Sequence, residues 1–152
     1  IPIWAKAAKA GKDITLTDGN MTRFLLSIED AVDLVVFALS YGGMGDILLK
    51  KAPATDMATL AYAVKDLYKS KSNIVETGAR HGENLHESLI GQEEMARSID
   101  MKDYFKIVPD TRDLNYSKFF DGKHIIPDDA YTSENTTRLD LNQVIDLLKE
   151  VL

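Results

Sequence analysis

The sequence predicts an α/β fold, and three observations support this. Short runs of β-favouring residues alternate with longer apolar segments of helical periodicity as far as residue 90, and the last third is mixed. Capping pairs and glycines bound the helical segments, and turn residues bound the extended ones. The 152 residues are 45% hydrophobic, which is enough for a core. We therefore expect one soluble domain over residues 1–152, with a small mixed sheet and flanking helices.

Start and stop signals mark the predicted helices. Pro2 suits a first helical turn, and the glycine at position 11 stops that helix. Residues 28–41 are the most apolar segment, so we expect them to be buried and to pack against more protein than the chain supplies. The capping boxes are Ser27 with Asp30 and Asp140 with Gln143. The expected helices are residues 2–10, 28–41, 55–68, 85–90, 93–95 and 140–151.

The predicted strands are short and rich in β-branched or aromatic residues. Residues 14–17 alternate Ile, Thr, Leu and Thr and end at turn residues 18–20. Residues 73–76 form an apolar run directly before a turn that contains glycine. The expected extended segments are residues 14–17, 21–26, 47–49, 73–76, 104–108, 116–120 and 124–126.

Residues 77–87, with the sequence TGARHGENLHE, are predicted to form a turn between a strand and the helix at residues 85–90. The two glycines of this turn allow backbone conformations closed to other residues and the close approach of a ligand. Arg80 offers a planar fork of donors that suits phosphate. Glu83 can accept hydrogen bonds from sugar hydroxyls. The combination suits one end of a nucleoside diphosphate.

Two other interpretations of this turn stay open at this point. Arg80 can pair with Glu83 or Glu87 in a surface turn that binds nothing, since exposed pairs of this kind are common. A metal site would use His81 and His86 with the same carboxylates. Histidines five residues apart do not share one face of a helix, so we predict no metal site.

The sequence lacks the motifs of cofactor binding and catalysis. It has no Gly-x-Gly-x-x-Gly, and the glycines in residues 42–45 follow a predicted helix, the reverse of the order in a dinucleotide site. It also has no Tyr-x-x-x-Lys pair, no Gly-x-Ser-x-Gly and no cysteine. We therefore predict that this chain contributes no catalytic residue, no cofactor-binding residue and no metal ligand.

Charge and composition exclude several classes of partner. A formal net charge of -6 with no basic block argues against a nucleic-acid partner. No apolar run approaches the length of a membrane span, and the absence of cysteine fits a reducing compartment, so we expect a cytoplasmic protein. The chain opens on Ile1 without an initiator methionine, so we expect it to come from the inside of a longer protein.

Motifs spread along the whole chain carry a family resemblance. They are IPIW (residues 1–4), LTDGNMTRF (16–24), GDI (45–47), KAPA (51–54), RHGENLHE (80–87), DTRDLNY (110–116) and NTTRLD (135–140). Together they resemble the C-terminal half of bacterial capsule and O-antigen UDP-N-acetylglucosamine 4,6-dehydratases of the polysaccharide biosynthesis protein family. Those enzymes are extended short-chain dehydrogenase/reductases, and the tail motifs resemble the branch that also inverts C5.

The resemblance implies that this chain is the substrate half of such an enzyme. An N-terminal Rossmann domain would bind NADP and carry the catalytic groups, and the complete enzyme would be a homo-oligomer. The implied roles are a pair of arginines on the diphosphate, a glutamate on the ribose hydroxyls, and a strand that lies along uracil mostly through its backbone. The residues that match are Arg23, Arg80, Glu83, Thr15, Leu16 and Thr17. Asn84 departs from the family, which usually has lysine there, so a possible extra cation near the phosphates is lost.

From the resemblance we expect the UDP-sugar-binding part of an NADP-dependent UDP-N-acetylglucosamine 4,6-dehydratase, a lyase, with 5-epimerase activity. The isolated chain is expected to be inactive. One alternative is a UDP-sugar 4-epimerase of the same superfamily, and another is a non-catalytic UDP-binding or assembly module that docks through residues 28–41. The alternative structural pairs for the arginines are Arg23 with Glu29 or Asp30, Arg112 with Asp113, and Arg138 with Asp140.

Overall fold

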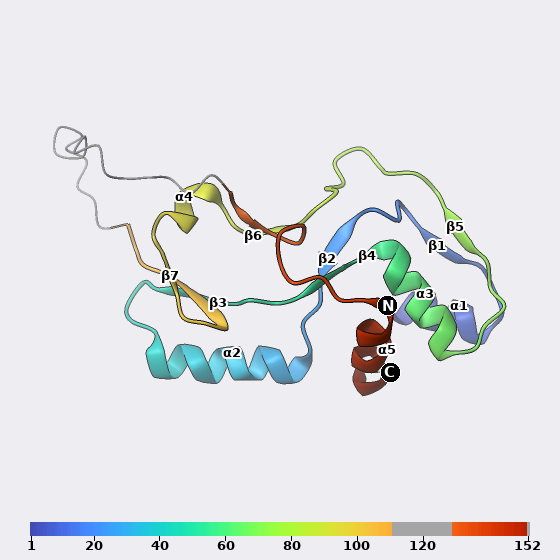
Figure 1. The fold of residues 1–152 in the computed structure, drawn as a ribbon, viewed down its shortest axis with the longest axis horizontal. Helices are drawn as coiled ribbons and strands as arrows, with labels where there is room; N and C mark the ends of the chain where they lie inside the picture. The colour runs from blue at the N-terminus through green and yellow to red at the C-terminus, as the bar shows by residue number, and fades with distance from the viewer. Residues whose placement is uncertain (111–128, 152) are drawn as a thin grey trace. The chain divides into compact units, whose positions relative to one another are not determined.

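The computed structural model describes residues 1–110 and 129–151 (Figure 1). The extended segments expected at residues 116–120 and 124–126, and the expected Arg112–Asp113 pair, lie outside the described residues. The helices are α1 (Pro2–Lys9), α2 (Ile28–Tyr41), α3 (Met57–Leu67), α4 (Gln92–Met95) and α5 (Leu141–Val151). The strands are β1 (Ile14–Leu16), β2 (Thr22–Phe24), β3 (Ile47–Lys50), β4 (Ala54–Asp56), β5 (Ile74–Glu76), β6 (Ser88–Ile90), β7 (Ser98–Asp100), β8 (Tyr104–Ile107) and β9 (Tyr131–Thr132).

The predicted α/β class is confirmed, with small sheets and flanking helices. Strands β1 and β5 pair in parallel, whereas β2–β4, β6–β9 and the three-stranded sheet β3–β8–β7 are antiparallel. The chain forms two compact units. The first comprises Ile1–Ser27, Ala52–Glu87 and Ser133–Leu152, and the second comprises Ile28–Lys51 and Ser88–Thr132. The single domain expected over residues 1–152 stays a prediction.

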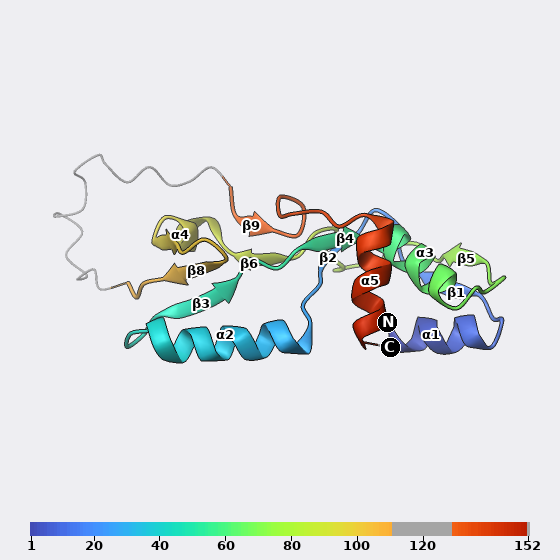
Figure 2. The same ribbon diagram turned by 60° about the horizontal axis from the view of Figure 1, so that its bottom comes forward.

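Helices α1, α3 and α5 form the core of the first unit together with β1, and both ribbon views show α3 beside α5 (Figures 1 and 2). Val144 and Leu148 are fully buried and lie four residues apart, so they share one face of α5. Ile14 of β1 is equally buried in the same cluster. Asp140 and Gln143 cap α5 reciprocally, each backbone N–H donating to the other side chain at 2.9 Å. This capping box was predicted and is confirmed.

Helix α2 packs against β3 in the second unit (Figures 1 and 2). The ring of Phe37 stacks on Tyr104 of β8 with centroids 3.8 Å apart. The bounds of α2 agree with the prediction, but no residue of α2 is buried, so the described residues do not supply the burial that we expected. A helix that packs on one sheet covers a single face, and α2 is apolar on other faces too. Its apolar residues that remain more than half exposed are Ile28, Val32, Val35, Val36 and Leu39.

The helix expected at residues 85–90 is wrong, because residues 88–90 form strand β6. Ile90 is fully buried and pairs with Tyr131 of β9, whereas Leu89 is 41% exposed. The backbone pairing with β9 makes residues 88–90 a strand, although Ser88 and Leu89 are both exposed. The strand that pairs with β6 lies far along the chain, so local spacing could not reveal it. None of the described helices is long and apolar enough to span a membrane.

Candidate functional site

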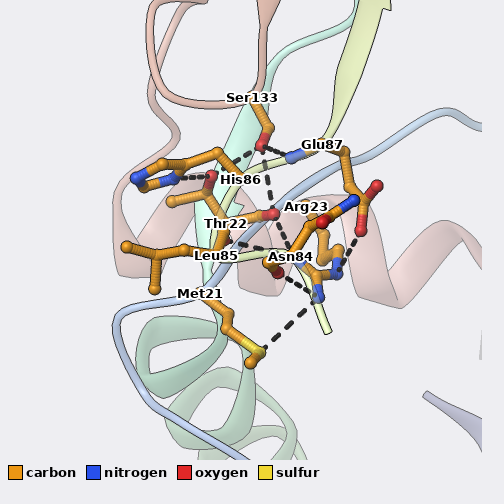
Figure 3. Close-up of polar contacts among 8 residues, drawn as sticks. All are labelled: Met21, Thr22, Arg23, Asn84, Leu85, His86, Glu87 and Ser133. Atoms are coloured by element: carbon orange, nitrogen blue, oxygen red, sulfur yellow. Dashed lines mark hydrogen bonds and ion pairs between the residues drawn. The ribbon is translucent and has the colours of Figure 1, made fainter. Parts of the chain in front are cut away.

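Arg23 is the most densely bonded side chain of the candidate site (Figure 3). It lies in the middle of β2, where its backbone pairs with Thr55 of β4. Its guanidinium group contacts residues 84–87, at the end of a segment that we call the arginine loop (residues 77–87). The contacts run from Nη1 to the carbonyl oxygens of Thr22 (2.7 Å) and Leu85 (3.3 Å), from Nη2 to the Asn84 carbonyl (3.1 Å) and Met21 Sδ (3.5 Å), and from Nε to Glu87 Oε1 (3.3 Å).

These contacts fasten the end of the arginine loop to β2. The backbone N–H of Thr22 adds a hydrogen bond of 2.9 Å to the Leu85 carbonyl. The Arg23 side chain is still 29% exposed, so the cation is not sealed from solvent. Its carboxylate partner is Glu87 and not Glu29 or Asp30, and the Asp30 carboxylate pairs with Lys50 instead.

A cluster of hydroxyl groups lies beside Arg23 (Figure 3). The hydroxyl of Thr22 lies 2.8 Å from Nδ1 of His86 and 2.6 Å from the hydroxyl of Ser133. Ser133 Oγ also accepts the backbone N–H of Glu87 at 2.8 Å. Thr22 and Ser133 are 2% and 0% exposed. No local pattern points to Ser133, because it is 111 residues away from Thr22 and belongs to no motif that suggests a site.

The arginine loop carries two glycines in the left-handed backbone region, Gly78 with φ +87° and Gly82 with φ +85°. Residues 80–83 form a tight turn, in which the Glu83 N–H donates to the Arg80 carbonyl and the Glu83 carboxylate accepts the Arg80 N–H, both at 3.1 Å. The Arg80 and Glu83 residues are exposed. No carboxylate in the described part of the chain forms an ion pair with the Arg80 guanidinium group. Arg80 is exposed, and the alternative ion pair between its side chain and Glu83 is replaced by the hydrogen bond from the Arg80 backbone N–H to the Glu83 carboxylate.

The strand expected to lie along uracil is β1 with Thr17 after it. The carbonyl oxygen of Thr15 accepts the indole N–H of Trp4 at 2.7 Å. The carbonyl oxygens of Leu16 and Thr17 accept the backbone N–H groups of residues 77 and 78, each at 2.9 Å. The beginning of the arginine loop is therefore tied to the carboxyl end of β1, beside its parallel partner β5. Carboxyl ends of parallel strands are where open α/β sheets bind ligands.

The structure thus anchors the arginine loop at both ends. Its beginning is bonded to Leu16 and Thr17, and its end is bonded to Arg23. Arg80 and Glu83 lie between these anchors, on the exposed turn. All six residues expected to bind substrate therefore belong to segments that hydrogen bonds connect within the first unit.

The glycines of residues 42–45, in the second unit, do not fit a dinucleotide. The N–H of Gly43 donates to Asp46 Oδ2 at 2.7 Å, and Lys106 Nζ lies 2.6 Å from the same carboxylate oxygen. The hydrogen bond from Lys106 lowers the pKa of Asp46 below its model-compound value of 3.8. The Asp46 carboxylate thus already accepts the backbone N–H of Gly43, which would otherwise be available to donate to a pyrophosphate. Among the described residues, no group of three or more His, Asp or Glu side chains could hold a metal ion.

The chain matches the family described as "Polysaccharide biosynthesis protein" over residues 1–109 and "Polysaccharide biosynthesis protein C-terminal" over residues 110–152. It therefore belongs to the polysaccharide biosynthesis protein family. The UDP-glucose 4-epimerase of Rickettsia rickettsii (strain Sheila Smith) is 47% identical to it over 150 residues, covering 97% of this chain and 44% of that protein. The UDP-glucose 4-epimerase of Rickettsia prowazekii (strain Madrid E) is 45% identical over the same shares.

A solved structure supports the fold. The X-ray structure of Pen from Bacillus thuringiensis superimposes with a TM-score of 0.77 at 22% identity, covering 98% of this chain and 43% of that chain. The chain spans less than half the length of the relatives and of this structure. The expected lyase activity of the dehydratase type is contradicted, because the relatives are named UDP-glucose 4-epimerase, which is an isomerase.

Proposed function

We propose that this chain is the UDP-sugar-binding part of an enzyme that modifies the sugar of a nucleotide sugar. Membership of the polysaccharide biosynthesis family and the name of the relatives support the substrate class. The observation that carries the proposal is the arginine loop, which is anchored at both ends and carries on an exposed turn an arginine, Arg80, that forms no ion pair with the described residues. Such an arginine can donate two parallel hydrogen bonds to a phosphate group.

Each expected substrate-binding residue has a role in this proposal. Arg80 holds the diphosphate through its open guanidinium group. Arg23 supplies a second positive charge through its partly exposed side chain and holds the end of the arginine loop. Glu83 accepts a hydrogen bond from a ribose hydroxyl through the carboxylate oxygen that does not bond to the Arg80 N–H. Thr15, Leu16 and Thr17 present backbone to the uracil ring.

The reaction that the name of the relatives supports is a UDP-sugar 4-epimerisation by the whole enzyme. The resemblance to short-chain dehydrogenase/reductases implies a nicotinamide cofactor, NADP, which would exchange hydride with the sugar. The described residues do not fit that cofactor, so we propose that its site and the proton-transfer groups lie in sequence beyond this chain. Assembly into a homo-oligomer and a cytoplasmic location belong to the same proposal.

Calorimetric titration of the chain with UDP tests the proposal. We expect measurable binding, and we expect Arg80→Ala to weaken it by roughly 10-fold to 150-fold, the loss of a charge-assisted hydrogen bond of about 1.5 to 3 kcal/mol. Arg138→Ala is the matched control, because Arg138 is an exposed arginine of the first unit whose side chain, within the described residues, donates to a carbonyl oxygen at 3.4 Å. No binding by the unaltered chain, or equal binding by the two variants, would contradict the proposal.

A further inference from the structure

The number of protons available in the hydroxyl cluster of Thr22 and Ser133 (Figure 3) determines which group donates in each hydrogen bond. Ser133 Oγ has three partners: the Glu87 N–H at 2.8 Å, the Thr22 hydroxyl at 2.6 Å and the Thr22 carbonyl oxygen at 3.1 Å. A hydroxyl group has one proton and two acceptor positions. The N–H can only donate and the carbonyl can only accept. Ser133 therefore satisfies all three contacts only when its proton goes to the carbonyl and the Thr22 hydroxyl donates to Ser133.

This arrangement fixes the protonation of His86. The Thr22 proton is already used on Ser133, so Thr22 Oγ1 must accept in its contact of 2.8 Å with Nδ1 of His86. Nδ1 then has to carry a proton. The alternative, with the proton on Nε2 alone, reverses both hydroxyl groups and loses the contact from Ser133 to the Thr22 carbonyl, which then keeps Arg23 Nη1 at 2.7 Å as a donor.

We propose that His86 carries a proton on Nδ1 and acts as a positioning residue for the arginine loop. The hydrogen bonds form a chain, which we call the relay: His86 donates to the Thr22 hydroxyl, Thr22 donates to the Ser133 hydroxyl, and Ser133 donates to the Thr22 carbonyl. The same Ser133 oxygen holds the N–H of Glu87, whose carboxylate pairs with Arg23. The hydrogen bond from His86 to Thr22 thus adds to the contacts that hold the end of the arginine loop on β2, and its effect on UDP binding rests on the function proposed above.

The charged groups around His86 do not reverse this assignment. Nε2 lies 3.5 Å from Glu134 Oε2, which would favour a proton on Nε2, but the Glu134 side chain is 65% exposed. An exposed ion pair contributes little, whereas a proton on Nδ1 allows all the contacts of Thr22 Oγ1 and Ser133 Oγ described above to form at once. The Glu87 carboxylate and the Arg23 guanidinium group are engaged with each other.

Nuclear magnetic resonance of the chain labelled with ¹⁵N-histidine tests the proton position directly. The spectrum is recorded at a pH where imidazole is neutral, and the signals of His86 are assigned by their loss in His86→Asn. We expect Nδ1 to show the shift of a protonated ring nitrogen and Nε2 that of an unprotonated one. The exposed His81 of the arginine loop is the internal comparison. The reverse pattern at His86 would overturn the proposal.

Two substitutions test the positioning role. The amide nitrogen of Asn takes the place of Nδ1, whereas that of Gln takes the place of Nε2, so His86→Asn keeps the donor to Thr22 and His86→Gln loses it. We expect the Glu87 amide proton to exchange with solvent faster in His86→Gln than in His86→Asn. We expect UDP affinity to fall roughly fivefold more in His86→Gln, the effect of about one net hydrogen bond. Equal exchange in both variants would overturn the relay.

A second pair of variants keeps the two proposals separable. Thr22→Ser keeps the hydroxyl, whereas Thr22→Val removes it with little change in shape. Only Thr22→Val should therefore accelerate exchange of the Glu87 amide proton. Only in Thr22→Val should the His86 proton no longer be held on Nδ1. If the unaltered chain shows the Nδ1 proton but binds no UDP, the relay stands and the proposed function fails. If it binds UDP and carries its proton on Nε2, the function stands and the relay fails.

Discussion

The Nε atom of Arg23 lies 3.3 Å from the Glu87 carboxylate, and this ion pair joins β2 to the end of the arginine loop. The rest of the guanidinium group is bonded to three carbonyl oxygens and to the sulfur of Met21. An arginine with this many fixed partners has a structural task besides any contact with an anion. Its planar fork suits several acceptors at once, which a lysine ammonium group cannot match.

Substitution of Arg23 is therefore expected to destabilise the first unit. We expect Arg23→Lys to lower the free energy of unfolding by about 1 kcal/mol, because lysine keeps the charge but not the fork, and Arg23→Ala to lower it by about 2 kcal/mol. Urea unfolding measures both changes. Arg138→Ala is the control and should change little. Equal stability of Arg23→Lys and the unaltered chain would show that the carbonyl contacts contribute nothing.

The core between α3 and α5 gives a second prediction. Leu148 is fully buried, so Leu148→Ala should lower the free energy of unfolding by about 2 to 5 kcal/mol through lost burial and a cavity. Leu39 on α2 is 83% exposed, so the same change there should stay within about 0.5 kcal/mol. Urea unfolding of the two variants compares them. A large loss on Leu39→Ala would mean that another molecule covers α2 in solution.

Local signals predicted the helices well and failed where a distant segment decides the outcome. The capping box of Asp140 and Gln143 lies within one turn, so sequence alone could place it. Residues 88–90 were predicted as helix because Leu89 and Ile90 follow a helical spacing with Leu85. Their pairing with β9 overrides that spacing, and no short-range pattern reports it.

The residues of the candidate site show the same difference between features that local sequence reveals and features that depend on distant segments. Arg80 and Glu83 stood out because glycines flank a charged turn, and the structure places them on that turn. The alternative pairs predicted for Arg23, Glu29 and Asp30, are near it in the sequence, whereas its partner Glu87 comes from a distant segment. Ser133 was missed for the same reason. Whether these residues bind a nucleotide stays a prediction, because an arrangement of donors does not identify the acceptor.

Acid is expected to weaken the second unit through two aspartates. Hydrogen bonds from Lys106 to Asp46 and from Lys51 to Asp100 lower the pKa of each aspartate below 3.8. Because these carboxyl groups bind protons more readily in the unfolded chain, their contribution is present above about pH 3.8 and is lost as the pH falls through the lower folded pKa values. Asp46→Asn should therefore differ from the unaltered chain at neutral pH and converge with it in strong acid.

Amide exchange of β3 and β8, measured over a pH series, checks this dependence. The control is Asp103→Asn, because Asp103 lies 3.9 Å from Lys102 in a pair whose side chains are 68% and 90% exposed. That variant should follow the unaltered chain at every pH. If Asp46→Asn and the unaltered chain differ equally in neutral and strongly acidic solution, the Asp46–Lys106 pair is not the origin of the acid effect.

Substitution of Gly82, compared with that of Gly11, distinguishes the effect of backbone strain from an effect on ligand binding. It occupies the third position of the turn at residues 80–83 with φ +85°, and an added Cβ would meet no atom within 4 Å. Gly82→Ala should therefore cost about 1 to 2 kcal/mol from strain alone. Gly11 has φ +64° and equally open surroundings outside the arginine loop, so Gly11→Ala should cost a similar amount. Only Gly82→Ala should also weaken UDP binding, measured by calorimetry, because it alters the turn that presents Arg80. Equal UDP affinity in the two variants would mean that the turn conformation does not matter for binding.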